Sequence, residues 1–387
     1  MYQLTDNQIA TLTALRHELH ERPEISGEEA QTAERISREL RALGADRIWR
    51  GVGGHGVAAQ FTGLKEEGPT VLLRCELDGL PIREISNLAY RSALAGKGHL
   101  CGHDGHMASL IGVAMGLANR PATGRVILLF QPAEETGAGA QAVIEDAQWA
   151  EIRPDYAFAY HNVPGRPLGE IGWRTGPSNC ASRGMKIKLE GKSSHAAAPE
   201  DGVSPGPAMS ALMAKLPKLS HGTVGDDDFA LVTLTHAILG EAAFGIAPAD
   251  GEVWTTLRSM TNVQMDRLMV DAQEIIEQCT DGLNVQITWH DVFLSVANHV
   301  QATELAQDVA NKQGRQTVEI ATPFRWSEDF GRFGDEGIKT SLLYIGAGEN
   351  HPQLHNPDYD FPDALIPVAS ELFIGIVAQI LGRAEGQ

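Results

Sequence analysis

Apolar residues follow two kinds of spacing along the chain, and each kind predicts a different structure. In the first and last thirds they form short continuous runs, at 57–61, 71–73, 125–130, 156–160 and 341–345. Runs without alternating polar residues are typical of strands buried on both faces, as in a sheet covered by helices. Helical spacing near both ends of the chain, at 6–21, 27–43 and 363–382, predicts such helices. These parts together predict an α/β domain.

Two local signals mark the first two expected helices. Thr5 with Gln8, and Ser26 with Glu29, have the spacing of a capping box, in which two side chains satisfy the first N–H groups of a helix. Gly44 follows the second helical stretch, where glycine commonly ends a helix. We therefore expect the chain to open with two helices.

The middle of the chain has a different pattern. Apolar and polar residues alternate strictly at 185–190, 231–239, 252–260 and 284–292, and helical spacing occurs at 205–219 and 263–279. The resulting order, β-α-β-β-α-β, is that of a ferredoxin-like fold. We predict an inserted α+β satellite domain at 179–292. It interrupts a discontinuous domain made of residues 1–178 and 293–387, with hinges near both junctions.

A cluster of chemically active side chains lies at 101–106, Cys-Gly-His-Asp-Gly-His. One thiol, two imidazoles and one carboxylate are the side chains that bind transition metals. The two glycines allow a tight turn, so that these side chains can converge on one point. The apolar run at 107–119 predicts a helix directly afterwards. The cluster is therefore expected to form a metal-binding turn that leads into a helix.

Further residues of metal-ligand or acid–base type follow the predicted strands. They are Asp78, Glu134, Glu135, His161 and His355, and each comes just after the carboxyl end of a predicted strand. Ligands of open α/β sheets bind outside these carboxyl ends. Five such residues at one edge of the sheet indicate a single site, which the cluster at 101–106 would complete.

Composition excludes several classes of partner. The 387 residues include 31 basic and 50 acidic side chains, a net charge of −19, which argues against binding to nucleic acid or to an anionic membrane. The four cysteines are scattered, unlike a disulfide framework. No basic and apolar leader is evident, and the longest apolar run falls short of the roughly 20 residues of a membrane span. A reduced, cytoplasmic protein is expected.

Ordered motifs along nearly the whole chain are similar to those of a known family. They are RHELHERPEISGEE, LDGLP, LCGHDGHM, QPAEET, HNVPG, GKSSHAAAP, WSEDFG and HNPDYDF. The chain resembles the amidohydrolase branch of the co-catalytic metallopeptidases, which includes hippurate hydrolase, indole-acetyl-amino-acid hydrolases and bacterial N-acyl-amino-acid hydrolases. The resemblance implies a zinc-exopeptidase-like α/β/α catalytic domain with an inserted ferredoxin-like satellite, in agreement with the insertion expected from periodicity.

The resemblance also implies a role for each candidate residue. The metal ligands would be Cys101, His103, Glu135, His161 and His355, with the thiolate of Cys101 bridging two divalent ions. Glu134 would be the general acid and base, and Asp78 would orient a ligating imidazole. His195, in the satellite domain, would reach the reacting carbonyl, and in dimeric relatives this histidine comes from the other subunit.

These roles imply a metal-dependent amidohydrolase that cleaves a small N-acyl amino acid or a similar amide. Two metal ions can activate a shared water and polarise the amide carbonyl. Thiolate with imidazole favours zinc, while manganese or cobalt fits the same ligands. A homodimer through the satellite domain is a further expectation.

Recognition of the substrate carboxylate is less clearly specified. Arg258, at the end of an alternating strand, is a candidate for binding it, and a solvated strand arginine is the competing interpretation. The sequence departs from the family at 244–248, where it reads Phe-Gly-Ile-Ala-Pro. Many relatives carry asparagine where this chain has Gly245, so the usual recognition of a free α-carboxylate is in question.

Three neighbours of the expected ligands have a second interpretation. Asp104 and His106 belong to the cluster, but each is expected to support the ligands through hydrogen bonds rather than to bind metal. Glu76 stands two residues before Asp78, where more distant metallopeptidases carry a ligating histidine. With His103 supplying that ligand, Glu76 is expected to pack or to form hydrogen bonds.

Four other functions compete with this interpretation. The G-x-S-x-G match at 202–206 suggests a serine hydrolase, but Pro205 lacks the N–H needed for the oxyanion hole and no strand precedes the serine. A cysteine amidase based on Cys101 would leave the other ligands without a role. A dipeptidase or carboxypeptidase of the same fold remains an alternative. A non-catalytic metal-dependent binding protein would have no need of Glu134.

Overall fold

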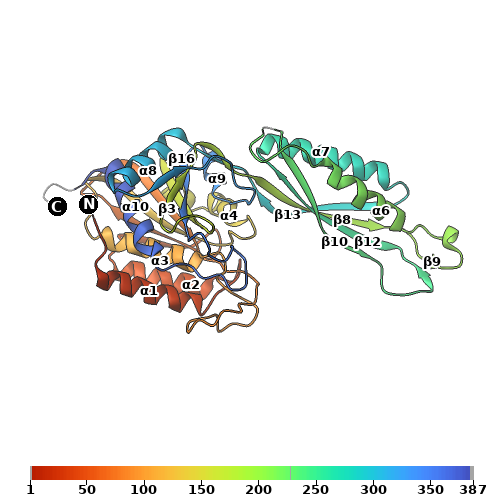
Figure 1. The fold of residues 1–387 in the computed structure, drawn as a ribbon, viewed down its shortest axis with the longest axis horizontal. Helices are drawn as coiled ribbons and strands as arrows, with labels where there is room; N and C mark the ends of the chain where they lie inside the picture. The colour runs from red at the N-terminus through yellow and green to blue at the C-terminus, as the bar shows by residue number, and fades with distance from the viewer. Residues whose placement is uncertain (1, 227, 384–387) are drawn as a thin grey trace. The chain divides into compact units, whose positions relative to one another are not determined.

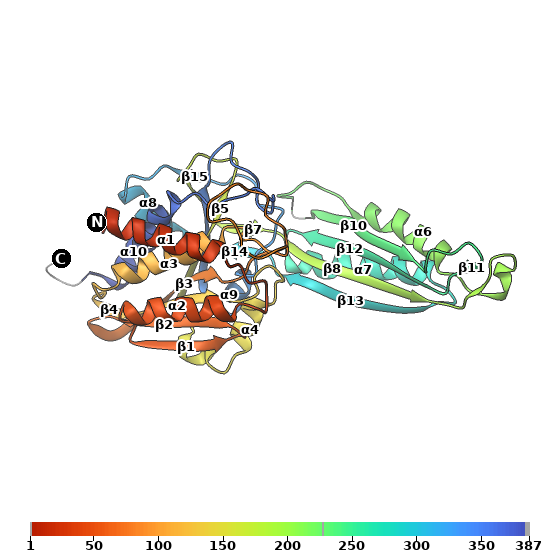
Figure 2. The same ribbon diagram turned by 90° about the horizontal axis from the view of Figure 1, so that it is seen from below.

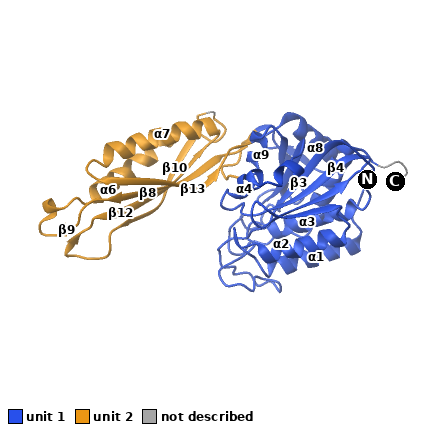
Figure 3. Ribbon diagram, turned by 180° about the vertical axis from the view of Figure 1, so that it is seen from behind, with its two compact units in different colours: residues 1–176, 297–321, 329–387 blue, residues 177–296, 322–328 orange. Residues whose placement is uncertain are grey.

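The computed structural model describes residues 2–226 and 228–383, and the chain forms two compact units (Figure 3). Unit 1 comprises Met1–Gly176, Ala297–Ala321 and Asp329–Gln387, and unit 2 comprises Pro177–Val296 and Thr322–Glu328. The short segment Thr322–Glu328 therefore belongs to unit 2, although unit 1 contains the chain on both sides of it. The sequence pattern gave no sign of this return.

Unit 1 is built on an eight-stranded mixed sheet (Figures 1 and 2). In spatial order its strands are β1 (Arg47–Val52), β2 (Gly56–Thr62), β4 (Thr123–Gln131), β3 (Lys65–Glu76), β5 (Tyr156–Val163), β16 (Lys339–Gly346), β6 (Ile171–Trp173) and β15 (Thr317–Glu319). The central strands β4, β3, β5 and β16 are parallel neighbours. Their carboxyl ends therefore meet at one edge, as the continuous apolar runs predicted.

Helices cover both faces of this sheet. They are α1 (Asp6–His20), α2 (Ala30–Ala42), α3 (His103–Gly116), α4 (Gly139–Glu145), α5 (Trp149–Ile152), α8 (Val300–Lys312), α9 (Gly331–Asp335) and α10 (Leu365–Leu381). Helices α3 and α10 pack together on one face, whereas α4 and α9 pack on the other. Nearly every residue of α3 is buried, because the sheet, α1 and α10 enclose it. Within the described residues, no helix has the length and apolar character needed to cross a membrane.

The two expected capping boxes have different outcomes. At α1, the Thr5 hydroxyl accepts the Gln8 N–H and the Gln8 side chain accepts the Thr5 N–H, so this prediction is confirmed. At α2 the prediction is wrong, because Glu29 is the N-cap and makes no side-chain cap bond. The Ser26 hydroxyl instead donates to Asp78, 52 residues away in sequence. Ser26 therefore bonds to a residue that is distant in sequence instead of capping α2.

Unit 2 has the expected β-α-β-β-α-β order. Its main elements are β8 (Ala181–Glu190), α6 (Gly206–Lys215), β10 (Ala230–Leu239), β12 (Asp250–Ser259), α7 (Asn262–Cys279) and β13 (Asn284–Phe293). Shorter pieces are β9 (Ser194–His195), β11 (Ile246–Ala247) and the 3₁₀ turns Pro199–Asp201 and Leu216–Leu219. The short strands β7 (Gly176–Asn179) and β14 (Val296–Asn298) each include a point where the chain passes from one unit to the other. The antiparallel order β10-β12-β8-β13 is that of a ferredoxin-like sheet, and both helices pack against it.

A buried charge network joins α1 to the first turn of α3. The fully buried Arg16 guanidinium forms ion pairs with Asp104 at 3.3 Å, Asp360 at 2.5 Å and Asp363 at 2.8 Å. His20 Nδ1 lies 2.9 Å from the same Asp104 carboxylate. Asp104 thus holds α3 in place, which agrees with its expected supporting role.

A close approach in this region requires a residue without a side chain. A Cβ added at Gly105, in the first turn of α3, would lie 2.2 Å from a ring carbon of the buried Phe361. We expect Gly105→Ala to lower the free energy of unfolding by about 1–3 kcal/mol, the usual cost of overpacking. The better helix propensity of alanine offsets at most about 1 kcal/mol of this. Urea unfolding measures the change.

Gly245→Ala is the matched control, because no atom lies within 4 Å of an added Cβ there and the backbone conformation suits any residue. It should leave the urea midpoint nearly unchanged. Equal stability of the two variants would contradict the packing argument.

The His20 environment makes stability depend on pH. Burial alone would lower the pKa of His20, but Asp104 and Glu84 outweigh it and raise the pKa to about 10. In the unfolded chain the pKa is about 6.5. The stabilisation is therefore complete below about pH 6.5 and is lost as the pH rises toward 10. Chemical unfolding across this range should show a steeper loss of stability in wild type than in His20→Gln, and parallel curves would refute the assignment.

Candidate metal centre

The candidate ligands gather at the carboxyl ends of the parallel strands of unit 1. Cys101 lies in the loop before α3, and Gly102, with φ of 97°, turns the chain into the helix. The helix begins at His103, four residues earlier than the apolar run predicted, so His103 sits in its first turn. Both residues are buried, at 5% and 1% exposure.

One group of potential ligands combines Cys101, His103 and His161, whose ligand atoms all lie within 4.8 Å of one another. Cys101 Sγ is 3.4 Å from His161 Nε2. His161 lies inside β5 rather than after its end, which corrects the expected strand boundary. Its Nδ1 bonds to the Asn162 carbonyl at 2.9 Å, so Nε2 is the nitrogen that faces the thiol.

A second group combines Cys101, Glu135 and His355, again within 4.8 Å. His355 Nε2 is 3.6 Å from Glu135 Oε2. His355 adopts a left-handed backbone with φ of 65°, and its N–H donates to the Leu100 carbonyl at 2.8 Å. This strained conformation, uncommon for histidine, brings the loop after β16 back to the Cys101 loop. Cys101 belongs to both groups.

The spacing of these atoms fits metal coordination. In a tetrahedral site with bonds of about 2.0–2.3 Å, neighbouring ligand atoms lie about 3.3–3.8 Å apart. The separations of 3.4 Å for Cys101–His161 and 3.6 Å for Glu135–His355 fall in this range. His103 Nε2 is buried and makes no hydrogen bond among the described residues. A metal ion would satisfy it, so the residues fit two cations that share one thiolate.

His103 is held by the residue expected to orient it. Its Nδ1 bonds to the Asp78 carbonyl at 2.8 Å and lies 3.5 Å from the Asp78 carboxylate. The backbone oxygen is thus the closer partner. The carboxylate in turn accepts the Ser26 hydroxyl at 2.7 Å and the Glu135 N–H at 3.0 Å. Asp78 therefore links the imidazole to the loop that contains the two glutamates.

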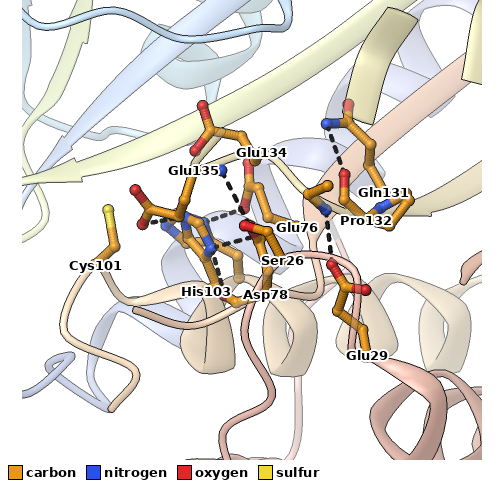
Figure 4. Close-up of polar contacts among 12 residues, drawn as sticks. Ser26, Glu29, Glu76, Asp78, Cys101, His103, Gln131, Pro132, Glu134 and Glu135 are labelled. Carbon is orange, nitrogen blue, oxygen red and sulfur yellow. Dashed lines mark hydrogen bonds and ion pairs between the residues drawn. The ribbon is translucent and has the colours of Figure 1, made fainter. Parts of the chain in front are cut away.

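A strained turn orients Glu134 and Glu135 after β4. Ala133 has φ of 51°, and its N–H donates to Glu29 at 2.8 Å. The two carboxylates leave the backbone in different directions, and Glu135 turns toward Cys101 and His103 (Figure 4). Glu134 is buried, and it also lies within 4.8 Å of ligand atoms of His103 and Glu135. One glutamate can therefore bind metal while the other stays beside it.

The electrostatic field of this site favours positive charge. Burial alone would lower the pKa of His103, but Glu76, Asp78 and Glu135 outweigh it and raise the pKa to about 10. Burial, without comparable carboxylate compensation, lowers the pKa of His161 to about 3. The negative potential that holds a proton on His103 would equally attract a divalent cation.

The same field argues against the thiol as a nucleophile. Burial raises the pKa of the Cys101 thiol well above its usual value, and the carboxylates of Glu135 and Glu134 add to the rise. A nucleophilic cysteine needs the opposite environment, because the thiolate is the reactive form. The serine motif at 202–206 lies in a loop between a 3₁₀ turn and α6, not after a strand. Cys101 therefore lacks the environment that a nucleophilic thiolate requires, and the serine lacks the preceding strand.

Three further residues support the ligands through hydrogen bonds, and of these only Asn162 was not singled out from the sequence. His106 Nδ1 lies 2.6 Å from Glu76, and its Nε2 meets the Asn162 side chain. Asn162 also donates to the Cys101 carbonyl at 3.1 Å. Glu76 and His106 lie close enough to His103 to form a third ligand group, but Glu76 is already engaged by His106 and by Arg74. His106 and Glu76 therefore take the hydrogen-bonding roles expected of them.

The two remaining candidates belong to unit 2. His195 is exposed on β9, which pairs with β11, and its Nδ1 accepts the Ala197 N–H at 3.0 Å. A neutral His195 therefore carries its proton on Nε2 and can donate it. Arg258 Nη1 donates to the Arg325 carbonyl at 2.9 Å and to the Ser327 hydroxyl at 3.0 Å. Carboxylate binding by Arg258 stays a prediction.

The family profile "Peptidase family M20/M25/M40" matches residues 72–379. An N-acetyl-L-cysteine deacetylase of Bacillus subtilis is 32% identical over 99% of this chain and 95% of its own length. A hippurate hydrolase of Campylobacter jejuni is 29% identical over 95% and 96%.

Solved structures also match this fold. The crystal structure of the Bacillus subtilis YXEP protein, described as a dinuclear metal binding peptidase, superimposes with a TM-score of 0.81 and 27% identity. The match covers 98% of this chain and 100% of the YXEP chain. Sequence motifs, ligand geometry and both comparisons agree. The chain belongs to peptidase family M20/M25/M40 and is a metal-dependent amidohydrolase.

Proposed function

We propose that the protein binds two divalent metal ions and hydrolyses the amide bond of a small N-acyl amino acid or a similar conjugate. The observation that carries this proposal is the pair of three-ligand groups that share Cys101, with Glu134 beside them. The relatives named as an N-acetyl-L-cysteine deacetylase and a hippurate hydrolase support the substrate class. Soft thiolate and imidazole ligands favour zinc, and manganese or cobalt could replace it.

Each metal ion would have its own set of three protein ligands, with Cys101 common to both. Cys101, His103 and His161 would hold one ion, and Cys101, Glu135 and His355 the other. Metal ions held there would lower the pKa of a water and polarise the amide carbonyl. Asp78 keeps Nε2 of His103 directed at its ion, because the Asp78 carbonyl binds the opposite ring nitrogen.

Glu134 acts as the proton carrier in this mechanism. Its carboxylate accepts a proton from the attacking water and delivers that proton to the leaving nitrogen, a contribution typically of about 10²–10⁴-fold. Glu134 is suited to this task because it is buried next to the ligand atoms of His103 and Glu135. Its neighbour Glu135 serves as the ligand, so the adjacent glutamates divide the two functions.

His195 stabilises the negative oxygen that develops on the reacting carbonyl. A donor aimed at such an oxygen typically contributes about 3–4 kcal/mol. The ring is prepared for this role, since Ala197 occupies Nδ1 and leaves Nε2–H to donate. Unit 2 would act as a satellite lid, with hinges near residues 179 and 292, that brings His195 to the substrate from the same subunit or its partner.

Substrate recognition would differ from that of many relatives near residue 245. The Gly245 carbonyl accepts the Ala196 N–H at 3.1 Å, so this position lies directly beside the short β9–β11 pair that contains His195. Glycine offers no side-chain amide for a substrate carboxylate. Arg258 remains the candidate ligand for the substrate carboxylate. If Arg258 binds that carboxylate strongly, activity as a dipeptidase or carboxypeptidase is the alternative to hydrolysis of N-acyl amino acids.

A cytoplasmic homodimer is the proposed assembly. Four free cysteines suit a reducing compartment. Exposed apolar side chains on unit 2, Ile238, Leu239 and Phe244, would be covered if two copies associated through this unit. Light scattering should give twice the chain mass, whereas a monomer at all accessible concentrations would rule the dimer out.

Removing the carboxylate of Glu134 tests the proposed mechanism. Glu134→Gln keeps the shape but cannot accept a proton, so kcat should fall by about 10²–10⁴ while metal content stays unchanged. Steady-state hydrolysis of N-acetyl and N-benzoyl amino acids provides the measurement. Glu319→Gln, an exposed change on β15, is the control and should leave kcat as it is. Full activity in metal-loaded Glu134→Gln would contradict this mechanism.

A further inference from the structure

A second set of charged residues is buried beside the metal centre and takes no part in the mechanism described above. At its centre is Arg74 on β3, whose side chain is fully buried. The guanidinium forms ion pairs with Glu76 and with Asp329, the latter at 2.6 Å, and its Nε donates to Gln131 at 3.0 Å. Such a buried group is stable only when every partner is in place, because an uncompensated buried charge is costly.

Asp329 is the most tightly held member of this set. Its carboxylate accepts the Gln131 side-chain N–H group at 2.9 and 2.8 Å, and the Ala140 N–H at 2.8 Å, in addition to the Arg74 ion pair. The residue is completely buried. These donors come from β3, the end of β4 and the start of α4. Together they fix the backbone at Asp329, the residue at which the chain returns from unit 2 to unit 1.

The backbone N–H of this fixed residue points at the proposed catalytic base. It donates to Glu134 Oε1 at a nitrogen–oxygen distance of 3.4 Å. A hydrogen bond to one carboxylate oxygen restricts rotation of the Glu134 carboxylate. Among the described residues, Asp329 shares a possible ligand group with Glu134 and Glu328 but none with Cys101. Its carboxylate is already engaged by Arg74, Gln131 and the Ala140 N–H, so its part is to hold Glu134 rather than to bind the two proposed ions.

At its other end, the network of Arg74 extends through Glu76 to Cys101, the ligand that both proposed metal sites share. Glu76 bonds to His106 at 2.6 Å, His106 meets the Asn162 side chain, and Asn162 donates to the Cys101 carbonyl at 3.1 Å. One continuous chain of buried contacts, through Arg74, thus connects the partner of Glu134 with the Cys101 loop. This chain of contacts can hold Glu134 and the Cys101 thiolate in fixed positions relative to each other.

We propose that Asp329 is a positioning residue for catalysis: its carboxylate, clamped by Arg74 and Gln131, fixes the backbone N–H that orients Glu134. The proposal rests on the proposed role of Glu134 as the base. The physical reason is that a misplacement of about 1 Å in a reacting group can cost about 100-fold in rate. In this proposal Asp329 acts through Glu134 and contacts neither the substrate nor the two proposed metal ions.

A charge exchange between Asp329 and Gln131 tests this proposal. In Asp329→Asn, the new amide can face the Gln131 amide donor, and the Arg74 ion pair is lost. In Gln131→Glu, two carboxylates face each other. The double variant Asp329→Asn with Gln131→Glu restores one carboxylate, one amide and the contact with Arg74. The matched control is Asp146→Asn, which alters a carboxylate that also accepts backbone N–H groups but lies outside this network.

We expect each single variant to lose about 10- to 100-fold in kcat, with KM changed less than about twofold, because the loss affects the transition state. The double variant should recover most of kcat, and Asp146→Asn should match wild type. If Asp329→Asn does not fold, Gln131→Glu against the double variant gives the same comparison. A folded, metal-loaded single variant with wild-type kcat would overturn the proposal, as would a folded double variant that recovers stability without kcat.

Amide hydrogen exchange at residues 328–331 provides a readout that is independent of activity. Exchange should be faster than wild type in each single variant and slower again in the double variant. Unchanged exchange in the single variants would overturn the positioning role. If wild type itself proves inactive on every amide, the proposed function fails while the exchange result still decides whether Asp329 is held in this way.

Discussion

Negative charge buried at one edge of a sheet is the constraint on which the site depends. Carboxylates from two different segments, Glu76 and Asp78 at the end of β3 and Glu134 after β4, are removed from water within a small volume. Like charges in such a place repel each other and lose hydration, so they persist only with compensating cations and hydrogen bonds. Arg74 and the imidazoles offset part of this charge. Two divalent cations would offset the rest, which is why the cluster is better understood as a metal site than as a polar core.

The parallel sheet explains how such distant residues meet. Strands β3, β4, β5 and β16 place their carboxyl ends at one edge, and the ends of β3, β4 and β16 lead into loops with an unusual backbone feature. Gly102, Ala133 and His355 all have positive φ, so three of these loops turn sharply toward one another. The strain is local, and the hydrogen bonds of Leu100 and Glu29 hold it in place.

The strands and the set of candidate residues were predictable because their signals are local. Apolar runs located the strands, and residue type with position after a strand brought Glu135 and His355 into the candidate set, whereas their roles as ligands came from the family resemblance and stay a prediction. What could not be predicted depends on contacts between distant segments. Ser26 looked like a helix cap because its partner Asp78 lies 52 residues away. Asp329 was visible only as part of the WSEDFG motif. Neither its contacts with Arg74, Gln131 and Ala140 nor the assignment of Thr322–Glu328 to unit 2 produces a periodic pattern in the sequence.

The most direct test of the central claim is metal content, measured by mass spectrometry together with hydrolysis of N-acyl amino acids before and after chelation. The account predicts about two metal ions per chain. Hydrolysis should be lost on chelation and restored by zinc or manganese. Full hydrolysis by metal-free protein, abolished by alkylation of Cys101, would contradict the account and make the thiol the nucleophile.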